Sequence, residues 1–260
     1  MHENFLAENQ SIAAVAIDYQ HGDCEPVHSH RCSQLIHALS GVVQVSTPLG
    51  VWMVPSGRGV WLPAHVSHSL RFIGGVQART LFVDPLARAD LPSQCQVVQV
   101  SPLLRELILA SFHLPVQYTP GGRDERITEL ILDELRLLPI LPLHLPQATD
   151  PQLVALCQQI CSNLSATWEL EEIAGTLGIS ARTLSRRFQR ETGLRFSDWL
   201  RRAKILAAMN ALAMGQTVLE VALELGYDSP SAFSAMFRRT LGVSPSEYIN
   251  PAIRPMLTTR

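Results

Sequence analysis

The stretch EIAGTLGIS at Glu172–Ser180 returns 48 residues later as EVALELGYD at Glu220–Asp228. Each copy is followed by a pair of apolar residues four positions apart, Leu184 and Phe188 in the first and Phe233 and Phe237 in the second. A spacing of four places two side chains on the same face of a helix. The sequence therefore predicts one supersecondary unit that is present twice.

Each copy has the local chemistry of a helix-turn-helix. A small alanine, Ala174 or Ala222, lets two helices approach closely, and Gly178 and Gly226 fit the left-handed position that ends a helix. Ser180 is placed to cap the next helix of the first copy, and Asp228 or Ser229 can do so in the second. The outward faces of the second helices are then free for function.

Those outward faces carry groups that can contact DNA. In the first copy they are Ala181, Arg182, Thr183, Ser185, Arg186, Gln189 and Arg190. In the second they are mostly small, and we take Pro230, Ser231, Ser234, Ala235 and Arg238 as its DNA-binding candidates. Guanidinium, amide and hydroxyl groups bond base edges or phosphates in the major groove. A single face of this kind also suits an ordinary solvated helix, but two in tandem favour DNA binding, with base readout mainly by the first copy.

Charge is unevenly distributed along the chain. The whole chain has a formal net charge of −2, yet Ser180–Arg260 contains 12 basic and 6 acidic residues. The remainder contains 9 basic and 17 acidic residues. Positive charge confined to the repeat is typical of a DNA-binding module joined to a domain with a different task.

The chain resembles the AraC/XylS family of bacterial transcription regulators. The matching segments are Ile173–Ala174, Leu177–Ser180, Leu184–Phe188, Glu191–Gly193, Val221–Ala222, Leu225–Tyr227, Ser229–Phe233, Phe237–Arg239, Leu241–Pro245 and Tyr248. The resemblance implies two units on successive major-groove segments, about 34 Å apart, joined by one long helix near residues 196–213. It also implies Arg182, Ser185 and Arg186 as base readers. Members often have arginine where this chain has Ala235.

The first half of the chain predicts strands. Short runs rich in Val, Leu, Ile and Trp alternate with glycine and proline turns over Ile12–Val83. Apolar residues do not recur at the spacing of a helix before Ser101. Many short strands separated by such turns are typical of an antiparallel sandwich or small barrel. The predicted fold class is α+β with two domains: an N-terminal antiparallel, cupin-like β-barrel and a C-terminal all-α domain with two helix-turn-helix units.

Part of this region resembles the cupin barrels. Gly22, His28, His30, Gln34 and Gly41 have the spacing of the first cupin motif, and His68 follows in a later segment. The resemblance implies His28, His30, Gln34 and His68 as ligands of a divalent metal, although Gln34 stands where cupins usually have glutamate. Histidines at H-x-H spacing on one strand share a face, as a metal requires.

Two interpretations of these residues remain open. Three imidazoles suit zinc, nickel or iron, but a neutral amide in place of a carboxylate weakens charge neutralisation of an ion. The same residues could instead line an effector pocket without a metal. The cofactor is thus unknown, with a divalent transition metal as a possibility, and Trp52 and Trp61 are further candidates for the pocket wall.

The domain boundaries follow from these patterns. We expect the cupin-like effector domain over residues 1–98, a helical segment that is a candidate for dimerisation over 99–138, and a linker without regular structure over 139–151. The DNA-binding domain then covers 152–251 and a tail covers 252–260. Ser101 followed by Pro102 is a good helix start.

The function predicted from these observations is a sequence-specific transcription regulator, not an enzyme, controlled by a small ligand in the cupin-like domain. Its partners would be double-stranded operator DNA, an effector, a second copy of itself, and RNA polymerase if it activates. Five cysteines without a disulfide framework, and no signal or membrane segment, predict a cytoplasmic location. The alternative is a metal-dependent cupin enzyme with an accessory DNA-binding domain.

Overall fold

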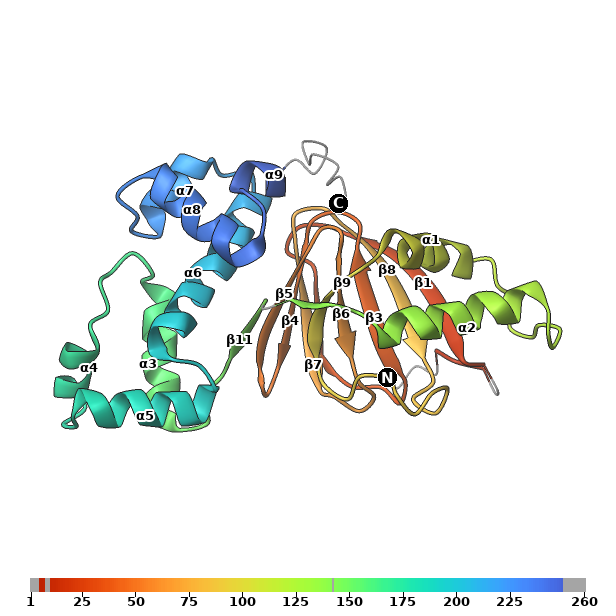
Figure 1. Cartoon of the computed structure of the whole chain (residues 1–260), viewed down its shortest axis with the longest axis horizontal. Coiled ribbons are helices and arrows are strands. Elements are labelled where there is room, and N and C mark those ends of the chain that lie inside the picture. Colours follow the sequence, from red (N-terminus) through yellow and green to blue (C-terminus); the bar gives the residue numbers. More distant parts are fainter. Residues whose placement is uncertain (1–4, 8–9, 142, 250–260) are drawn as a thin grey trace, which may run out of the picture. The chain divides into compact units, whose positions relative to one another are not determined.

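The structure is a computed structural model that describes residues 5–7, 10–141 and 143–249 of the 260-residue chain (Figure 1). It divides into two compact units, residues 1–144 and 145–260. The division falls inside the segment predicted as a linker, and the predicted tail, 252–260, lies outside the described residues. None of the described helices is long and apolar enough to cross a membrane.

The strands form two antiparallel sheets. The six-stranded sheet has the order β1-β8-β3-β6-β9-β10, and the five-stranded sheet has the order β11-β5-β4-β7-β2. Their bounds are β1 Ile12–Tyr19, β2 Cys24–His28, β3 Ser33–Ala38, β4 Val42–Thr47, β5 Gly50–Pro55, β6 Arg58–Leu62, β7 His68–Ile73, β8 Val76–Val83, β9 Gln96–Gln99, β10 Ile140–Leu141 and β11 His144–Pro146.

The structure confirms the antiparallel N-terminal strands but does not confirm that they form a barrel. A barrel closes only when its two edge strands pair, whereas β1 and β10 remain edges of one sheet and β2 and β11 edges of the other. The described strands are therefore two facing sheets. The predicted linker also differs, because β10 pairs with β9 through Ile140 and Val98 where irregular structure was expected. An edge strand tolerates neighbouring prolines such as Pro139.

The six-stranded sheet is covered on both faces, although its edge strand β1 keeps exposed residues at 16–18. Its outer face packs against α1 (Pro102–Ser111) and α2 (Arg123–Arg136), with Trp61 and Leu81 in the same apolar cluster as Leu104 and Ile131. Its inner face turns toward the five-stranded sheet, which explains why β3 is buried at every position. Ser101 caps α1 as predicted, and its side chain accepts a hydrogen bond from the Leu104 amide.

The second unit is helical, as predicted. Its elements are α3 Pro151–Ser162, α4 Leu170–Thr176, α5 Ala181–Thr192, α6 Phe196–Ala213, α7 Val218–Glu224, α8 Pro230–Leu241 and α9 Pro245–Ile249. Helices α4 and α5 form the first helix-turn-helix, α7 and α8 form the second, and α6 connects them (Figure 1). The first helix-turn-helix packs around a core that contains Phe188, Phe196 and Trp199.

The two helix-turn-helix units have the same backbone conformation in their turns. Gly178 and Gly226 both adopt left-handed conformations, with φ of 68° and 74°. After each glycine the next amide bonds back to the helix, from Ile179 to the Ala174 carbonyl and from Tyr227 to the Ala222 carbonyl. This pattern of a helix end with an αL glycine satisfies carbonyls that would otherwise lack partners.

Candidate DNA interface and ligand pocket

Helix α5 presents the first candidate DNA-binding face. Ser180 begins the helix, and its side chain accepts a hydrogen bond from the Thr183 amide. Leu184 and Phe188 are fully buried, which turns the other faces of the helix outward. The exposed predicted residues are Arg182, Thr183, Arg186, Gln189 and Arg190, while Ala181 and Ser185 are half-buried. Arg182 and Arg186 form no ion pair with the described residues, so both guanidinium groups remain available to DNA.

Arg187 lies beside these residues but has a different role. Its guanidinium donates to the Asp150 carboxylate and, at 3.0 Å, to Gln152 Oε1. Hydrogen bonds from Arg187 hold the pKa of Asp150 below its usual value. Asp150 in turn caps α3 by accepting from the amides of Gln152 and Leu153. Arg187 therefore ties the recognition helix to α3, which is consistent with its absence from the predicted DNA-binding set.

Helix α8 presents the second candidate face. Ser229 rather than Asp228 caps it, and its side chain accepts from the Ala232 amide at 3.2 Å. Phe233 and Phe237 are fully buried beneath the helix. Of the predicted residues, Ser231, Ala235 and Arg238 are exposed, and Pro230 and Ser234 are half-buried. Arg238 is the one charged residue among those predicted for this face, so they offer fewer base-reading groups than the predicted residues of α5.

A cavity of about 310 Å³ lies in the N-terminal unit between the two sheets. Strands β1, β3 and β8 contribute residues from one sheet, and β2 and β7 contribute residues from the other. Most of its wall is aliphatic or aromatic: Phe5, Val15, Ile17, Ile36, Leu70, Phe72, Ala78 and Phe82. Its polar groups include Tyr19, Glu25, His28, His30, Gln34 and Thr80. An apolar wall with few converging polar groups is typical of a small-ligand site.

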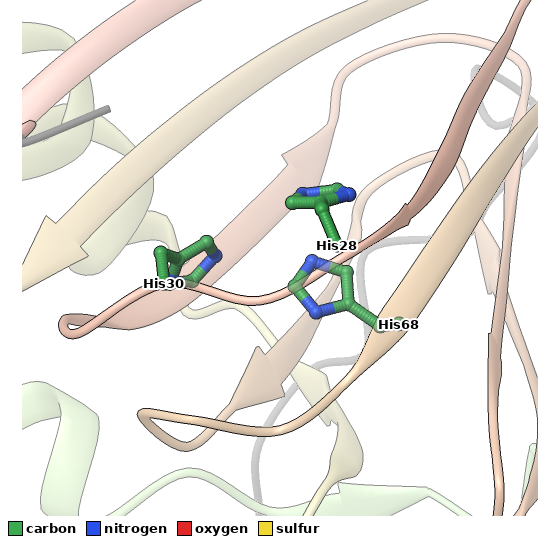
Figure 2. A group of neighbouring side chains, drawn as sticks. All are labelled: His28, His30 and His68. Carbon is green, nitrogen blue, oxygen red and sulfur yellow. The ribbon is translucent and has the colours of Figure 1, made fainter. Parts of the chain in front are cut away.

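Three histidines converge beside this cavity (Figure 2). The ligand nitrogens of His28, His30 and His68 all lie within 4.8 Å of one another. His28 ends β2 and pairs directly with His68 at the start of β7. His30 lies in the loop after β2, so the two H-x-H histidines do not share one strand as predicted. The loop is held by a hydrogen bond from the His65 amide to the His30 carbonyl, 2.9 Å long.

Backbone carbonyls orient all three rings. His28 Nδ1 lies 2.8 Å from the Pro26 carbonyl, and His30 Nδ1 lies 2.6 Å from the Cys32 carbonyl. His68 Nδ1 lies 2.9 Å from the Val66 carbonyl. Because a carbonyl only accepts, each Nδ1 carries a proton and donates it, which leaves Nε2 of the neutral ring with its lone pair. Metal-binding histidines are commonly oriented in this way.

His68 is the most deeply placed of the three. Its side chain is 1% exposed, and Nε2 has no hydrogen-bond partner in the described structure. Burial lowers the pKa of His68 to about 4, so the ring is neutral at pH 7. A buried nitrogen with an unused lone pair is costly unless something bonds to it. This atom is therefore the strongest structural indication of a ligand at the cluster.

Gln34, on β3, reaches the cluster from the opposite sheet. Its Oε1 lies 3.0 Å from His30 Nε2. With Nδ1 of His30 donating to a carbonyl, the neutral ring requires either that the Gln34 amide presents its N–H group or that a cation lies between two lone pairs. The residues thus fit a divalent transition metal, which His28, His30 and His68 would hold and whose Lewis acidity would polarise a bound ligand.

The sequence prediction missed Glu25 and Tyr19. Tyr19 Oη donates to Glu25 Oε1 at 2.5 Å, and Glu25 Oε2 lies 3.8 Å from His28 Nε2. Burial, and then the hydrogen bond to Glu25, raises the pKa of Tyr19 well above its usual range. Glu25 precedes His28 by three positions, which would place them on opposite faces of a regular strand. A register shift between them in the β2–β7 pairing brings both to the cavity.

Trp52 and Trp61, predicted as candidates for the pocket wall, are not among the residues that line this cavity. Trp61 is fully buried in the cluster under α1 and α2, and its Nε1 donates to the Pro92 carbonyl at 2.7 Å. Trp52 stacks on His144 with ring centroids 4.2 Å apart. Trp61 therefore packs on the outer face of its sheet, whereas Trp52 pairs through Val45 with the cavity residue Leu70 and so lies on the inner face of the other sheet.

With this geometry in place, the chain can be assigned to a class. It matches the model of the AraC-like ligand binding domain over residues 9–185 and that of a helix-turn-helix domain over residues 173–250. The chain belongs to the AraC family of transcription regulators, with a ligand-binding N-terminal domain and a DNA-binding C-terminal domain. The resemblance predicted from the sequence is thereby confirmed.

The chain is similar to one named regulator and to two solved structures. The chain is 35% identical to the HTH-type transcriptional regulator NimR of Escherichia coli (strain K12), over 91% of this chain and 88% of that protein. It is 33% identical to the DNA-binding domain of AdpA in complex with a target DNA, over 42% of this chain and 99% of that one, with a TM-score of 0.37. A structure of ToxT from Vibrio cholerae is 13% identical over 92% of this chain and 98% of that one, with a TM-score of 0.38.

Proposed function

We propose that this regulator binds operator DNA by placing α5 and α8 in two successive major-groove segments, and that a small ligand between the N-terminal sheets changes its affinity for the operator. The observation that carries the proposal is the duplicated, capped unit with an exposed face on each second helix. Arg182 and Arg186 would read bases on α5, while α8 would mainly position the protein. Because its partner would be chromosomal DNA, we place it in the cytoplasm.

The chemistry of the cavity indicates what kind of effector it accepts. Its lining residues include one carboxylate, that of Glu25, and no lysine or arginine. An anionic effector would therefore lose its hydration without gaining a cationic partner, which is unfavourable. We infer that the effector is a small neutral or cationic molecule with an apolar body, or a divalent transition metal. The relatives are named as regulators, which favours a sensor over a cupin enzyme here.

We also propose that two copies associate through the helices on the six-stranded sheet. Leu103 of α1 and Leu130 of α2 are 48% and 39% exposed, and Leu137 at the end of α2 is 68% exposed. Exposed leucines on neighbouring helices suit a contact between copies. Sedimentation velocity at micromolar concentration should show a dimer, and Leu130→Lys combined with Leu137→Lys should shift it to monomer. A monomeric wild-type protein would remove this part of the proposal.

The experiment that tests the regulator function measures binding of the full chain to a duplex from the region upstream of its own gene. Fluorescence anisotropy would compare this duplex with a scrambled one at two salt concentrations. We expect the specific duplex to bind at least about 1,000-fold more tightly, with an affinity that falls as salt rises. Equal affinities for both duplexes would contradict sequence-specific regulation from this region.

A second measurement tests ligand control. Thermal shift would compare small neutral aromatic compounds with their carboxylate derivatives, and any compound that stabilises the chain would be added to the anisotropy assay. Coupling between two sites is reciprocal, so a true effector must change operator affinity by the factor by which DNA changes effector affinity. Stabilisation by carboxylates alone would contradict the charge argument.

A further inference from the structure

We propose that Glu25 is the carboxylate partner of a divalent transition metal held by His28, His30 and His68, and that it supplies the charge that Gln34 lacks. The proposal rests on a metal as occupant of the ligand pocket proposed above. It moves the anionic group of the site from β3, where the cupin motif places it, to β2 in the facing sheet.

Glu25 lies close to the histidines. Glu25 lines the same cavity as His28 and His30, and its Oε2 lies 3.8 Å from His28 Nε2. The register shift between Glu25 and His28 is what brings both side chains to one side of β2. Such irregularities in strand pairing commonly re-aim a side chain next to a functional site. A regular strand would have turned Glu25 away from the histidines.

A hydrogen bond from Tyr19 orients the carboxylate of Glu25. Tyr19 Oη donates to Glu25 Oε1, so one carboxylate oxygen is fixed and the other faces the histidine side. Tyr19 is itself held by stacking on Phe72, with ring centroids 3.5 Å apart. Carboxylates at metal sites are usually oriented by such a hydrogen bond from a second residue. The Tyr19–Glu25 pair therefore has the form of a prepared anionic group.

Among the residues of the site, Glu25 provides the negative charge that a divalent ion needs. Three neutral imidazoles and the Gln34 amide provide no negative charge for a divalent ion, and His68 Nε2 is buried without a partner among the described residues. Placing an uncompensated double charge in this site would be unfavourable. Glu25 is the one acidic residue among those lining the cavity, and no basic residue there competes for it. Its carboxylate is therefore the group that can partly neutralise the charge of the ion.

The test is metal binding by the purified full chain, first stripped with chelator. Zinc affinity would be measured by competition with a chromophoric chelator, and cobalt would report coordination through its visible absorption. We expect one ion per chain, and we expect Glu25→Gln to weaken zinc binding about 10- to 100-fold, which is typical when a group that supports a metal site is removed. Circular dichroism would confirm that each variant is folded.

Two matched variants separate the role of Glu25 from general charge. Asp23→Asn removes an exposed carboxylate two positions away, and it should change zinc affinity by less than about twofold because screened surface charges act weakly. The double variant Glu25→Gln with Gln34→Glu returns the charge to the motif position. It should recover most of the affinity that Glu25→Gln loses.

Two results would overturn the proposal. One is a Glu25→Gln variant that binds zinc as tightly as the wild type, which would reduce Glu25 to an ion pair with His28. The other is a wild-type chain that binds neither zinc nor cobalt. Operator binding measured on the same preparations distinguishes a failure of the metal proposal from a failure of the regulator function. Protein that binds the operator but binds no metal would overturn the metal proposal and would leave the regulator function intact.

Discussion

The two turn glycines should respond very differently to alanine, although they occupy equivalent places in the duplicated unit. Gly178 and Gly226 both have left-handed backbones, a conformation that disfavours an L-residue by about 1 to 2 kcal/mol. A Cβ at Gly178 would meet nothing within 4 Å. A Cβ at Gly226 would lie 2.4 Å from the Ser165 carbonyl oxygen, so the backbone itself would have to move.

We therefore expect Gly178→Ala to lower the free energy of unfolding of the helical unit by about 1.5 kcal/mol and Gly226→Ala by about 3 kcal/mol or more. With a urea m-value of about 1.5 kcal/mol/M, the unfolding midpoints would fall by about 1 M and about 2 M. Circular dichroism at 222 nm follows the helices during the titration. Equal shifts, or a larger shift for Gly178→Ala, would refute the argument from the Ser165 contact.

Two further predictions concern the DNA-binding face and the buried histidine. Arg186→Ala should reduce the preference for operator over scrambled DNA by about 1 to 3 kcal/mol, and by more than Ser234→Ala does. The reason is that the guanidinium of Arg186 can donate two hydrogen bonds to one base, whereas Ser234 is a half-buried hydroxyl. Similar losses for the two variants in the anisotropy assay would count against the view that α5 reads the bases more than α8 does. His68 has a pKa of about 4 in the folded chain, against an ordinary value of 6.5. Below pH 6.5 the unfolded chain takes up this proton while the folded chain resists it, so stability of the metal-free chain should fall by about 3 kcal/mol between pH 6.5 and pH 4. Urea titrations followed by tryptophan fluorescence would show a flatter pH dependence for His68→Gln, and an unchanged dependence would show that other groups are responsible.

The helical half was predictable because its signals are local. A helix cap such as Ser180, an αL glycine such as Gly178 and an apolar pair at a spacing of four each depend on a few consecutive residues. Their duplication removed the ambiguity that one copy would have had. The connecting helix accordingly begins at Phe196 and ends at Ala213, close to where the family resemblance placed it.

The arrangement of the strands was less predictable. Alternating burial tells which residues face inward, but it does not tell whether the edge strands pair with each other. The sequence therefore allowed a closed barrel, whereas the described strands form two sheets. Similarly, a tryptophan on a strand indicates burial without indicating which layer it enters, and Trp61 packs under the helices rather than into the cavity.

The pocket was half predictable. The spacing of His28, His30, Gln34 and His68 identified the polar cluster, and the structure brings all four residues together. Glu25 was not found because its position depends on a shift in strand register, which the one-dimensional sequence does not show. Its partner Tyr19 gave no signal either, because Tyr19 lies on β1 in the other sheet and meets Glu25 only when the two sheets face each other.

DNase I footprinting of the purified chain on the DNA upstream of its own gene tests the central claim most directly. Two recognition helices joined by α6 should protect two adjacent major-groove segments, about 34 Å apart, and Arg186→Ala should abolish this protection at the same protein concentration. Diffuse protection that disappears as salt rises and does not respond to Arg186→Ala would contradict the account, because it would reveal only sequence-independent attraction to phosphates.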